Sequence, residues 1–169
     1  MNTPAPTTGR VVSLHLHPAR GGMPMRPVEQ VEAVEQKGLA GNGRYFGRVS
    51  RSSGSPSRRQ VTLMEREQIA EHATSLGLES IAPGDVRSNI ETLGIDLISL
   101  IGRKVQVGEA VLHFYEDRTP CEKMDALCPG LRELMTNRRQ GVLAEVLRSG
   151  VIRLGDRISP LPQSADESG

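Results

Sequence analysis

The chain has 169 residues, which is enough for one domain with a sizeable hydrophobic core. Its 21 Lys and Arg residues are nearly balanced by 20 Asp and Glu residues, and it has only two Tyr, two Phe and no Trp. Neither charge nor base stacking therefore favours a nucleic-acid partner. No stretch reaches the roughly 18 uncharged apolar residues of a membrane span, and no apolar signal region precedes the first predicted strand. We expect a cytoplasmic protein that contacts neither nucleic acid nor membrane.

The pattern along the chain predicts a single domain over residues 10–160, between flexible tails at 1–9 and 161–169. Because aromatic residues are scarce, its core must be built from Val, Leu, Ile and Met. The two cysteines, Cys121 and Cys128, are too few for a disulfide framework, and a reducing compartment would keep both as free thiols.

The first predicted strand spans residues 11–17, where apolar and polar side chains alternate. His15 and His17 would share one face of that strand, a spacing that could ligate a metal ion. Because no third ligand is found nearby and Pro18 ends the run, two imidazoles on a half-exposed strand are the favoured interpretation.

A glycine-rich stretch and a basic stretch come before the first predicted helix. Residues 38–47 contain four glycines, which indicates tight turns, and no Gly-Lys-Ser/Thr follows them as a phosphate loop would require. Residues 48–59 hold four arginines, five serines and no acid, which favours a mobile, solvated loop. The alternative is a lid whose guanidinium groups bind an anion.

Residues 60–63 are predicted to form a short strand that runs directly into a helix. Thr62 and Glu65 have the spacing of a capping box at the start of that helix. One helix face carries apolar residues at i, i+4 and i+7, namely Ile69, Ala73 and Leu76. Gly77 stands where a left-handed residue would end the helix, so we expect this helix to pack and not to catalyse.

Arg87 and Asn89 lie two residues apart, shortly after a Pro-Gly turn. On an extended chain their side chains would point to the same side. An arginine and an amide on one face can bind a phosphate or a polar heterocycle, although such a pair is more often a plain surface feature.

Short strands dominate the C-terminal half. Residues 104–107 and 110–115 flank a Gly-X turn and predict a β-hairpin. Residues 141–147 and 151–154 flank a Ser-Gly pair and predict a second hairpin, with a short helix over 131–135 between the two. Many short strands with turn signals and few helices indicate a mainly β fold, a closed or nearly closed barrel.

Cys121 follows the first predicted hairpin, which would place its thiol at a barrel mouth, where ligand sites are common. Arg118 and Lys123 are close to it in sequence, and neighbouring cations stabilise a thiolate. The thiolate is the form that attacks sulfur, carries a persulfide or binds a soft metal. The alternative is an ordinary thiol at a strand end. Cys128 is expected to be structural, with a resolving thiol or a second ligand as the other readings.

Seven short motifs occur in a fixed order along the chain. They are Arg-Gln-Val-Thr-Leu (59–63), Gly-Asp-Val-Arg-Ser-Asn-Ile (84–90), Gly-Ile-Asp-Leu (94–97), Val-Gly-Glu-Ala-Val-Leu (107–112), Thr-Pro-Cys-Glu-Lys-Met-Asp (119–125), Gly-Val (141–142) and Gly-Asp (155–156). Together they resemble the MOSC domain, named for the C-terminal domain of molybdenum-cofactor sulfurase. The resemblance runs from about residue 11 to residue 158 and so covers nearly the whole chain.

The resemblance implies a MOSC-type β-barrel with a few short helices and a pocket that holds the cysteine. Family members bind the molybdopterin-type molybdenum cofactor, carry sulfur as a cysteine persulfide, or reduce N-hydroxylated compounds with molybdenum bound to the cysteine. Pyridoxal phosphate binding is also associated with the family. Cys121 matches the family cysteine, which implies that it is the catalytic group and the molybdenum ligand. The residues expected around the cofactor are Arg59, Arg87, Asn89, Arg118 and Lys123.

Three functions are compatible with this resemblance. The first is a reductase of N-hydroxylated small molecules, with Cys121 as metal ligand and a partner protein as electron donor, because no flavin or nicotinamide fingerprint is present. The second is a sulfurtransferase in which Cys121 carries a persulfide received from a cysteine desulfurase. The third is a non-enzymatic carrier of the pterin cofactor.

The glycine-rich stretch departs from the family pattern. Many relatives have Gly-Asp followed by Arg-His, where this chain has Gly41-Asn42-Gly43-Arg44-Tyr45. Losing that carboxylate argues against a proton-handling or cation-binding role for the loop. It favours instead a subgroup whose ligand is more anionic.

Overall fold

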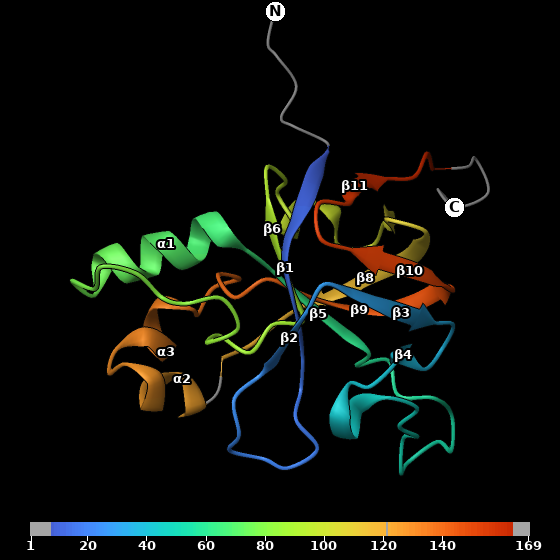
Figure 1. The fold of residues 1–169 in the computed structure, drawn as a ribbon, viewed down its shortest axis with the longest axis horizontal. Helices are drawn as coiled ribbons and strands as arrows, with labels where there is room; N and C mark the ends of the chain where they lie inside the picture. Colours follow the sequence, from blue (N-terminus) through green and yellow to red (C-terminus); the bar gives the residue numbers. More distant parts are fainter. Residues whose placement is uncertain (1–7, 121, 164–169) are drawn as a thin grey trace, which may run out of the picture.

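Seven strands close into a β-barrel in the computed structural model (Figure 1), which describes residues 8–120 and 122–163, with the backbone alone at 44, 122 and 123. Around the barrel the strands follow the order β1 (Gly9–Leu16), β6 (Ile90–Leu93), β5 (Val61–Glu65), β9 (Val142–Arg148), β8 (Ala110–Asp117), β7 (Lys104–Val107) and β11 (Arg157–Pro160). Pairing of β11 with β1 closes the ring. The β5–β6 pair is parallel, and the other neighbouring pairs are antiparallel. The mainly β barrel expected from the sequence is confirmed.

A smaller sheet of β10 (Gly150–Arg153), β3 (Gln30–Val34) and β4 (Gly38–Leu39) lies beside the barrel, and β2 (Arg26–Val28) extends the barrel sheet at β1. The hairpin predicted from residues 141–147 and 151–154 is wrong, because β10 pairs with β3 and not with β9. The start of β10 is held instead by the β7–β8 turn, where Glu109 N–H donates to the Val151 carbonyl at 3.1 Å. The hairpin predicted between β7 and β8 is confirmed, with Val107 opposite Ala110.

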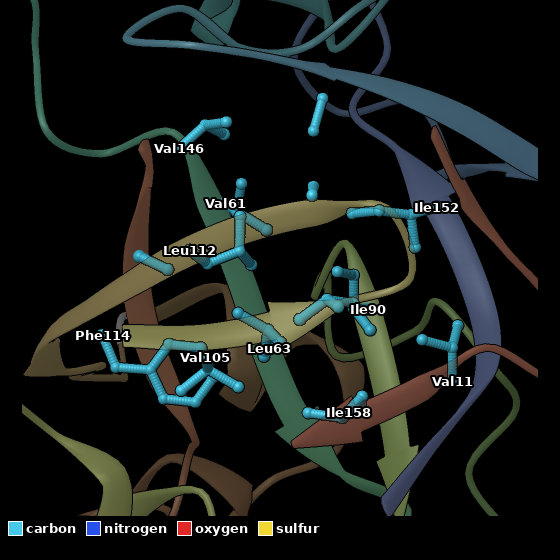
Figure 2. Close-up of a cluster of buried hydrophobic side chains, with 14 of the residues drawn as sticks. Val11, Val61, Leu63, Ile90, Val105, Leu112, Phe114, Val146, Ile152 and Ile158 are labelled. Atoms are coloured by element: carbon cyan, nitrogen blue, oxygen red, sulfur yellow. The ribbon is translucent and has the colours of Figure 1, made fainter. Parts of the chain in front are cut away.

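Aliphatic side chains fill the barrel. Strand alternation directs them inward: in β7, Val105 and Val107 are buried, while Lys104 and Gln106 are exposed. Figure 2 shows Leu63 of β5 beside Ile90 of β6, and Val61 of β5 beside Leu112 of β8. All four side chains are fully buried. Burial of these side chains against one another is the main force that holds the barrel closed.

The helices lie together on one side of the barrel (Figure 1): α1 (Arg66–Ser75), α2 (Glu122–Leu127) and α3 (Leu131–Leu134). Two 3-10 turns, η1 (Gly43–Tyr45) and η2 (Ile98–Leu100), complete the described elements. A second apolar cluster joins the helices to the barrel: Met64, Ile69, Ala73, Ile81, Val86, Met124, Leu131 and Met135. No helix within the described ranges has the length and apolar character needed to cross a bilayer.

The capping box predicted at the start of α1 is wrong. Thr62 lies within β5, and Glu65 is itself the N-cap residue and makes no side-chain capping bond. A cap at Thr62 would start the helix at residue 63. The strand instead continues to Glu65, and the helix begins at Arg66. The remainder of the helix prediction is confirmed, since Ile69 and Ala73 are buried and Gly77 follows the helix with φ of +72°.

Glu65 is the one acidic side chain at the α1 N-terminus that is held partly out of solvent. The pKa of Glu65 is raised from 4.5 to about 7, chiefly by burial and to a smaller extent by the carboxylates of Asp96, Glu67 and Glu71. A hydrogen bond from Leu97 N–H to Glu65 Oε2, at 3.3 Å, opposes these effects. Because the folded pKa lies above the unfolded value, the protonated form stabilises the fold, and this stabilisation is lost as the pH rises from about 4.5 through about 7.

Replacing Glu65 by Gln removes this titration. We expect the melting temperature of Glu65→Gln to match that of the wild type near pH 4.5 and to exceed it by several degrees at pH 8, measured by calorimetry across the pH range. Glu79→Gln is the matched control, because Glu79 is exposed. Parallel pH profiles for wild type and Glu65→Gln would contradict the expectation.

Candidate functional site

A cleft of about 810 Å³ opens between the β1–β2 loop and the glycine-rich stretch that leads into η1. Its size is in the range of small-molecule and cofactor sites. It is lined by His17, Pro18, Ala19, Arg20, Met23, Pro24, Met25, Arg26, Pro27, Gly41 and Gly43. Methionine and proline form an apolar wall, and Arg20 and Arg26 supply the charge.

The cleft is built from parts of the chain that contain no acid. Residues 1–28 and 36–64 include no Asp or Glu, and both cleft walls come from these segments. A cavity with fixed positive charge and an apolar wall attracts an anion, because nothing in its lining competes for the guanidinium groups. Small anions with a flat organic part suit such a lining better than cations or neutral lipids.

Gly43 joins the two walls. Its φ is +44°, and a Cβ at this position would overlap the Pro18 carbonyl oxygen and lie 2.8 Å from the His17 carbonyl oxygen. Any other residue would push the glycine-rich stretch away from the end of β1. The close approach of these two backbones therefore depends on glycine.

A separate recess of only about 10 Å³ shares His17 with the cleft. The recess is lined by His17, Asn42, Tyr45, Arg59, Gln60, Val61, Thr62 and Asn89. Arg59 is exposed, and its guanidinium carbon lies 5.6 Å from the centre of the Tyr45 ring. Among the predicted cofactor residues, the structure thus brings Arg59 and Asn89 to one recess.

Asn89 uses its whole side-chain amide inside the protein. Its Oδ1 accepts hydrogen bonds from the Thr62 N–H and hydroxyl groups, at 3.1 and 3.2 Å. Its Nδ2 donates to the His15 carbonyl at 3.0 Å and to Asn42 Oδ1 at 3.1 Å. Since an amide offers two donor hydrogens and two acceptor lone pairs, none is left for a ligand. Asn89 therefore acts as a positioning residue that holds β1, β5 and Asn42 together.

The expectation that Arg87 and Asn89 point to the same side is wrong. Arg87 has φ of +63°, so the chain is not extended there. The Arg87 side chain turns outward instead, and its Nη1 donates to the Met23 carbonyl at 3.1 Å. This bond ties the 84–89 segment to the outer wall of the cleft, because Met23 lines the cleft.

Arg118 is buried behind the cleft, at 7% exposure. Its guanidinium donates to Ser88 Oγ at 2.6 Å and to the carbonyls of Val86 and Arg87 at 3.0 and 3.2 Å. Its backbone N–H donates to the Gly141 carbonyl at 2.9 Å. Arg118 therefore fixes the chain just before Cys121 against the segment that carries Arg87.

The same segment is anchored from the α1 side. Glu91 is fully buried and accepts from Arg66 Nη1 at 2.9 Å and from Gly84 N–H at 2.8 Å. Arg66 also donates to the Ile81 carbonyl. Arg118 and the Glu91–Arg66 ion pair thus both hold residues 81–91 in place, which makes this segment a rigid support for the site.

The basic stretch over residues 48–59 follows η1 and leads into β5, and Arg59 at its end lines the recess. A bridge between Val49 and Pro56 brings its two halves together. At its end, Arg58 lies over the Tyr115 ring at 4.1 Å and donates to Glu145 at 3.0 Å. The mobility expected for this stretch stays a prediction.

Several predicted residues are placed less fully. Cys121 lies outside the described residues, as does the side chain of Lys123, so their proximity to the cleft stays a prediction. Cys128 is half-buried, packs beside the helical cluster, and is a free thiol. Within residues 8–120 and 122–163, no group of His, Cys, Asp and Glu is arranged to hold a metal ion, and His15 binds the Ser88 carbonyl through Nδ1 at 3.1 Å.

The sequence reasoning missed Arg20 and Arg26, which supply the charge of the cleft. Both lie in a turn-rich segment without a motif, so nothing local marked them. The absence of acids over residues 1–28 is the signal that could have identified them. This absence becomes clear only by comparison with the whole chain, in which acidic and basic residues are nearly equal in number.

Comparison with known proteins adds a family and a fold. A family model described as the MOSC domain matches residues 29–159. None of the curated proteins matches the sequence significantly.

Solved structures share the architecture. The YuaD protein from Bacillus subtilis is 19% identical, with a TM-score of 0.75, covering 92% of this chain and 97% of that chain. YiiM from Geobacillus stearothermophilus is 17% identical, with a TM-score of 0.70 and coverage of 94% and 78%. YiiM from Escherichia coli is 19% identical, with a TM-score of 0.64 and coverage of 93% and 72%. At these identities the similarity shows the fold alone.

Proposed function

The chain belongs to the MOSC domain family, and from that premise we propose that it binds the molybdopterin-type molybdenum cofactor and reduces N-hydroxylated small molecules. Cys121 is the proposed molybdenum ligand. The observation that supports this most directly is the cationic, acid-free cleft of about 810 Å³ beside the recess.

The residues present fit such a cofactor. The phosphate of the cofactor needs cations, and its polar heterocycle needs hydrogen-bonding groups beside an apolar wall. The dithiolene-bound metal needs a soft ligand. Arg20 and Arg26 line the cleft and Arg59 lines the recess, so the phosphate would find guanidinium groups. Met23 and Met25 would cover the heterocycle, and methionine adapts well to flat, polarisable surfaces.

The bound cofactor would supply two-electron chemistry at molybdenum. The chain itself would bind and orient it. The arginines fix the phosphate, the apolar wall excludes water from one face, and the supports built on Asn89, Arg118 and Glu91 keep the walls in place. Small losses of position at these supports should weaken cofactor retention.

The reaction needs an external reductant. Breaking the N–O bond of a hydroxylamine-type substrate consumes two electrons and two protons, and yields the amine or amidine and one water. Because the sequence carries no flavin or nicotinamide fingerprint, a redox partner protein is the proposed electron donor.

Metal and pterin analysis of the purified protein tests the proposal. The protein is expressed together with cofactor synthesis, purified without oxygen, and assayed for molybdenum and for pterin. We expect both to be retained in the wild type. Absence of both would remove the proposal.

Cys121→Ala tests the metal ligand. Since alanine has no soft donor, we expect molybdenum retention to fall at least about tenfold while the overall fold is kept. Cys128→Ala is the matched control and should retain molybdenum, because it removes the other thiol. Equal molybdenum in Cys121→Ala and wild type would show that Cys121 is not the ligand.

If the protein is instead a persulfide carrier, the same protein preparation should give a different result. Incubation with a cysteine desulfurase would add a sulfur atom to Cys121, visible by mass spectrometry and lost in Cys121→Ala. Added sulfur in a protein without molybdenum would assign sulfur transfer in place of reduction.

A further inference from the structure

Positive charge is concentrated at one end of the barrel. Residues 17–28 and 36–64 hold eight of the 21 Lys and Arg residues and none of the 20 Asp and Glu residues. The rest of the chain holds the other 13 cations and all of the acids. The β1–β2 loop and the chain from η1 to β5 extend from the same end of the barrel (Figure 1). A chain with almost no net charge therefore has one strongly basic end.

A hairpin over residues 48–57, which we call the basic hairpin, presents part of this charge to solvent. A bridge at Val49 and a bond from Ser57 N–H to the Arg48 carbonyl, at 2.9 Å, join its two arms. Arg48 and Arg51 are both exposed, and neither forms an ion pair within the part of the chain that the structure describes. Two guanidinium groups are thus available to a partner.

Exposed apolar side chains accompany these arginines. Phe46 is 36% exposed and Val49 is 54% exposed, and both lie within two residues of Arg48. Seven of the eight cations of the basic end are arginines. Arginine and aromatic side chains are enriched where proteins contact one another, whereas lysine is depleted there. The composition of this surface therefore favours another protein as its partner.

Ring contacts connect the basic hairpin with the cleft. The ring of His17, which lines the cleft, lies 4.6 Å from the ring of Tyr45. Arg59 follows the basic hairpin, and its guanidinium carbon lies 5.6 Å from the centre of the same Tyr45 ring. A partner bound to the basic hairpin would therefore lie beside the cleft that is proposed to hold the cofactor.

We propose that the basic hairpin, together with Phe46, is a docking surface for an acidic protein. Carboxylates on the partner match the planar fork of a guanidinium group, and the field of the basic end steers them to it. In the proposed function this partner is the electron donor. That identity rests on the proposed function, whereas the charge and the exposure of the surface do not.

A nucleic acid or an anionic bilayer suits this surface less well. A single strand needs aromatic side chains on which its bases stack, and Tyr45 is already in contact with His17 and Arg59. An anionic bilayer attracts lysine and arginine alike, and its extended surface would also repel the acid-rich remainder of the chain. The acidic patch of a protein is local and avoids that repulsion.

Nuclear magnetic resonance of nitrogen-15-labelled full-length protein tests the docking surface. Two acidic redox proteins, a flavodoxin and a two-iron ferredoxin, are the probes. With either probe, the backbone amides of residues 46–59 should shift and saturate. The affinity should fall at least about tenfold when the ionic strength is raised from about 0.01 M to about 0.2 M, because salt screens the attraction.

Charge reversal at two positions identifies the residues that bind. We expect Arg48→Glu combined with Arg51→Glu to weaken binding of the probes at least about tenfold at about 0.1 M salt, without lowering the melting temperature. Arg132→Glu combined with Arg138→Glu is the matched control, because it changes the net charge equally at exposed residues of the helical side. At this salt a charge acts over only about 10 Å, so the control should bind within about twofold of wild type.

Three results would overturn the inference. The first is equal affinity of wild type and the Arg48→Glu, Arg51→Glu variant. The second is the absence of a saturable shift with both probes, a measurement that needs no variant to fold. The third is tighter binding of residues 46–59 to phosphatidylglycerol vesicles or to single-stranded DNA than to either acidic protein.

Turnover of the cofactor-loaded protein with an N-hydroxylated amidine separates this inference from the proposed function. We expect the Arg48→Glu, Arg51→Glu variant to lose at least about tenfold in rate with reduced flavodoxin, and to keep the wild-type rate with reduced riboflavin, a small neutral reductant. Equal flavodoxin-driven rates would overturn the inference and leave the proposed function standing. Protein without molybdenum and pterin, but with the expected binding results, would remove the proposed function and leave the docking surface standing.

Discussion

Asn89→Asp is expected to destabilise the fold by about 3–5 kcal/mol at pH 8. The replaced NH₂ group donates to the His15 carbonyl and to Asn42 Oδ1, and a carboxylate would place negative charge against both acceptors. Because the site is buried, with Asn89 1% exposed, water cannot relieve the contact. The melting temperature should fall by about 10 °C, measured by calorimetry.

The pH dependence of this loss identifies its cause. In Asn89→Asp, one carboxyl oxygen would face two acceptors in a buried site, which raises the pKa of this carboxyl. Its protonated form can donate one hydrogen bond, so Asn89→Asp should lose less stability at pH 5 than at pH 8. Asn137→Asp is the matched control, since it makes the same chemical change at an exposed residue. An Asn89→Asp protein as stable as wild type at pH 8 would mean that the two acceptors do not depend on this amide.

Gly141→Ala is expected to cost at least about 3 kcal/mol of folding stability. Gly141 has φ of +83°, and a Cβ would overlap the Leu63 carbonyl oxygen and lie 2.9 Å from Met64 Cα. Because β5 lies in the barrel wall, the backbone that Cβ would meet cannot move aside without opening the ring. The free energy of unfolding in urea provides the measurement.

The Gly155→Ala variant separates the cost of steric overlap from the conformational cost of a positive φ. Gly155 has a similar φ of +86°, but a Cβ there meets nothing within 4 Å. It should therefore show only the conformational cost of about 1 kcal/mol. If both variants lost the same stability, steric overlap at Gly141 would not be the cause. Since Gly141 also accepts the backbone bond from Arg118, its variant should weaken cofactor retention as well.

The barrel could be predicted from the sequence because local signals agreed with the fold. The β7–β8 hairpin has a Gly-X turn between alternating strands, and the face and end of α1 follow from spacing alone. The position of β10 could not be predicted in this way. Its partner β3 is far away in sequence, and the start of β10 is bonded to the β7–β8 turn at Glu109, which no local pattern marks.

The site was predictable in composition but not in geometry. The choice of Arg87 and Asn89 came from an assumed extended chain, and the left-handed backbone at Arg87 breaks that assumption. Asn89 looked like a ligand group because an amide is versatile, yet tertiary contacts consume all of its bonds.

Closure of the barrel through β1 and β11 has a consequence for how the chain acquires its structure. The seam joins Gly9 to Ile158 and Arg10 to Arg157, strands from opposite ends of the described chain. Such a contact requires a large loss of chain entropy before it forms, so the ring is expected to close late. During synthesis, the earlier strands must wait with an open edge until the last strand leaves the ribosome. That interval would be the time at which the unfinished barrel depends most on protection from aggregation.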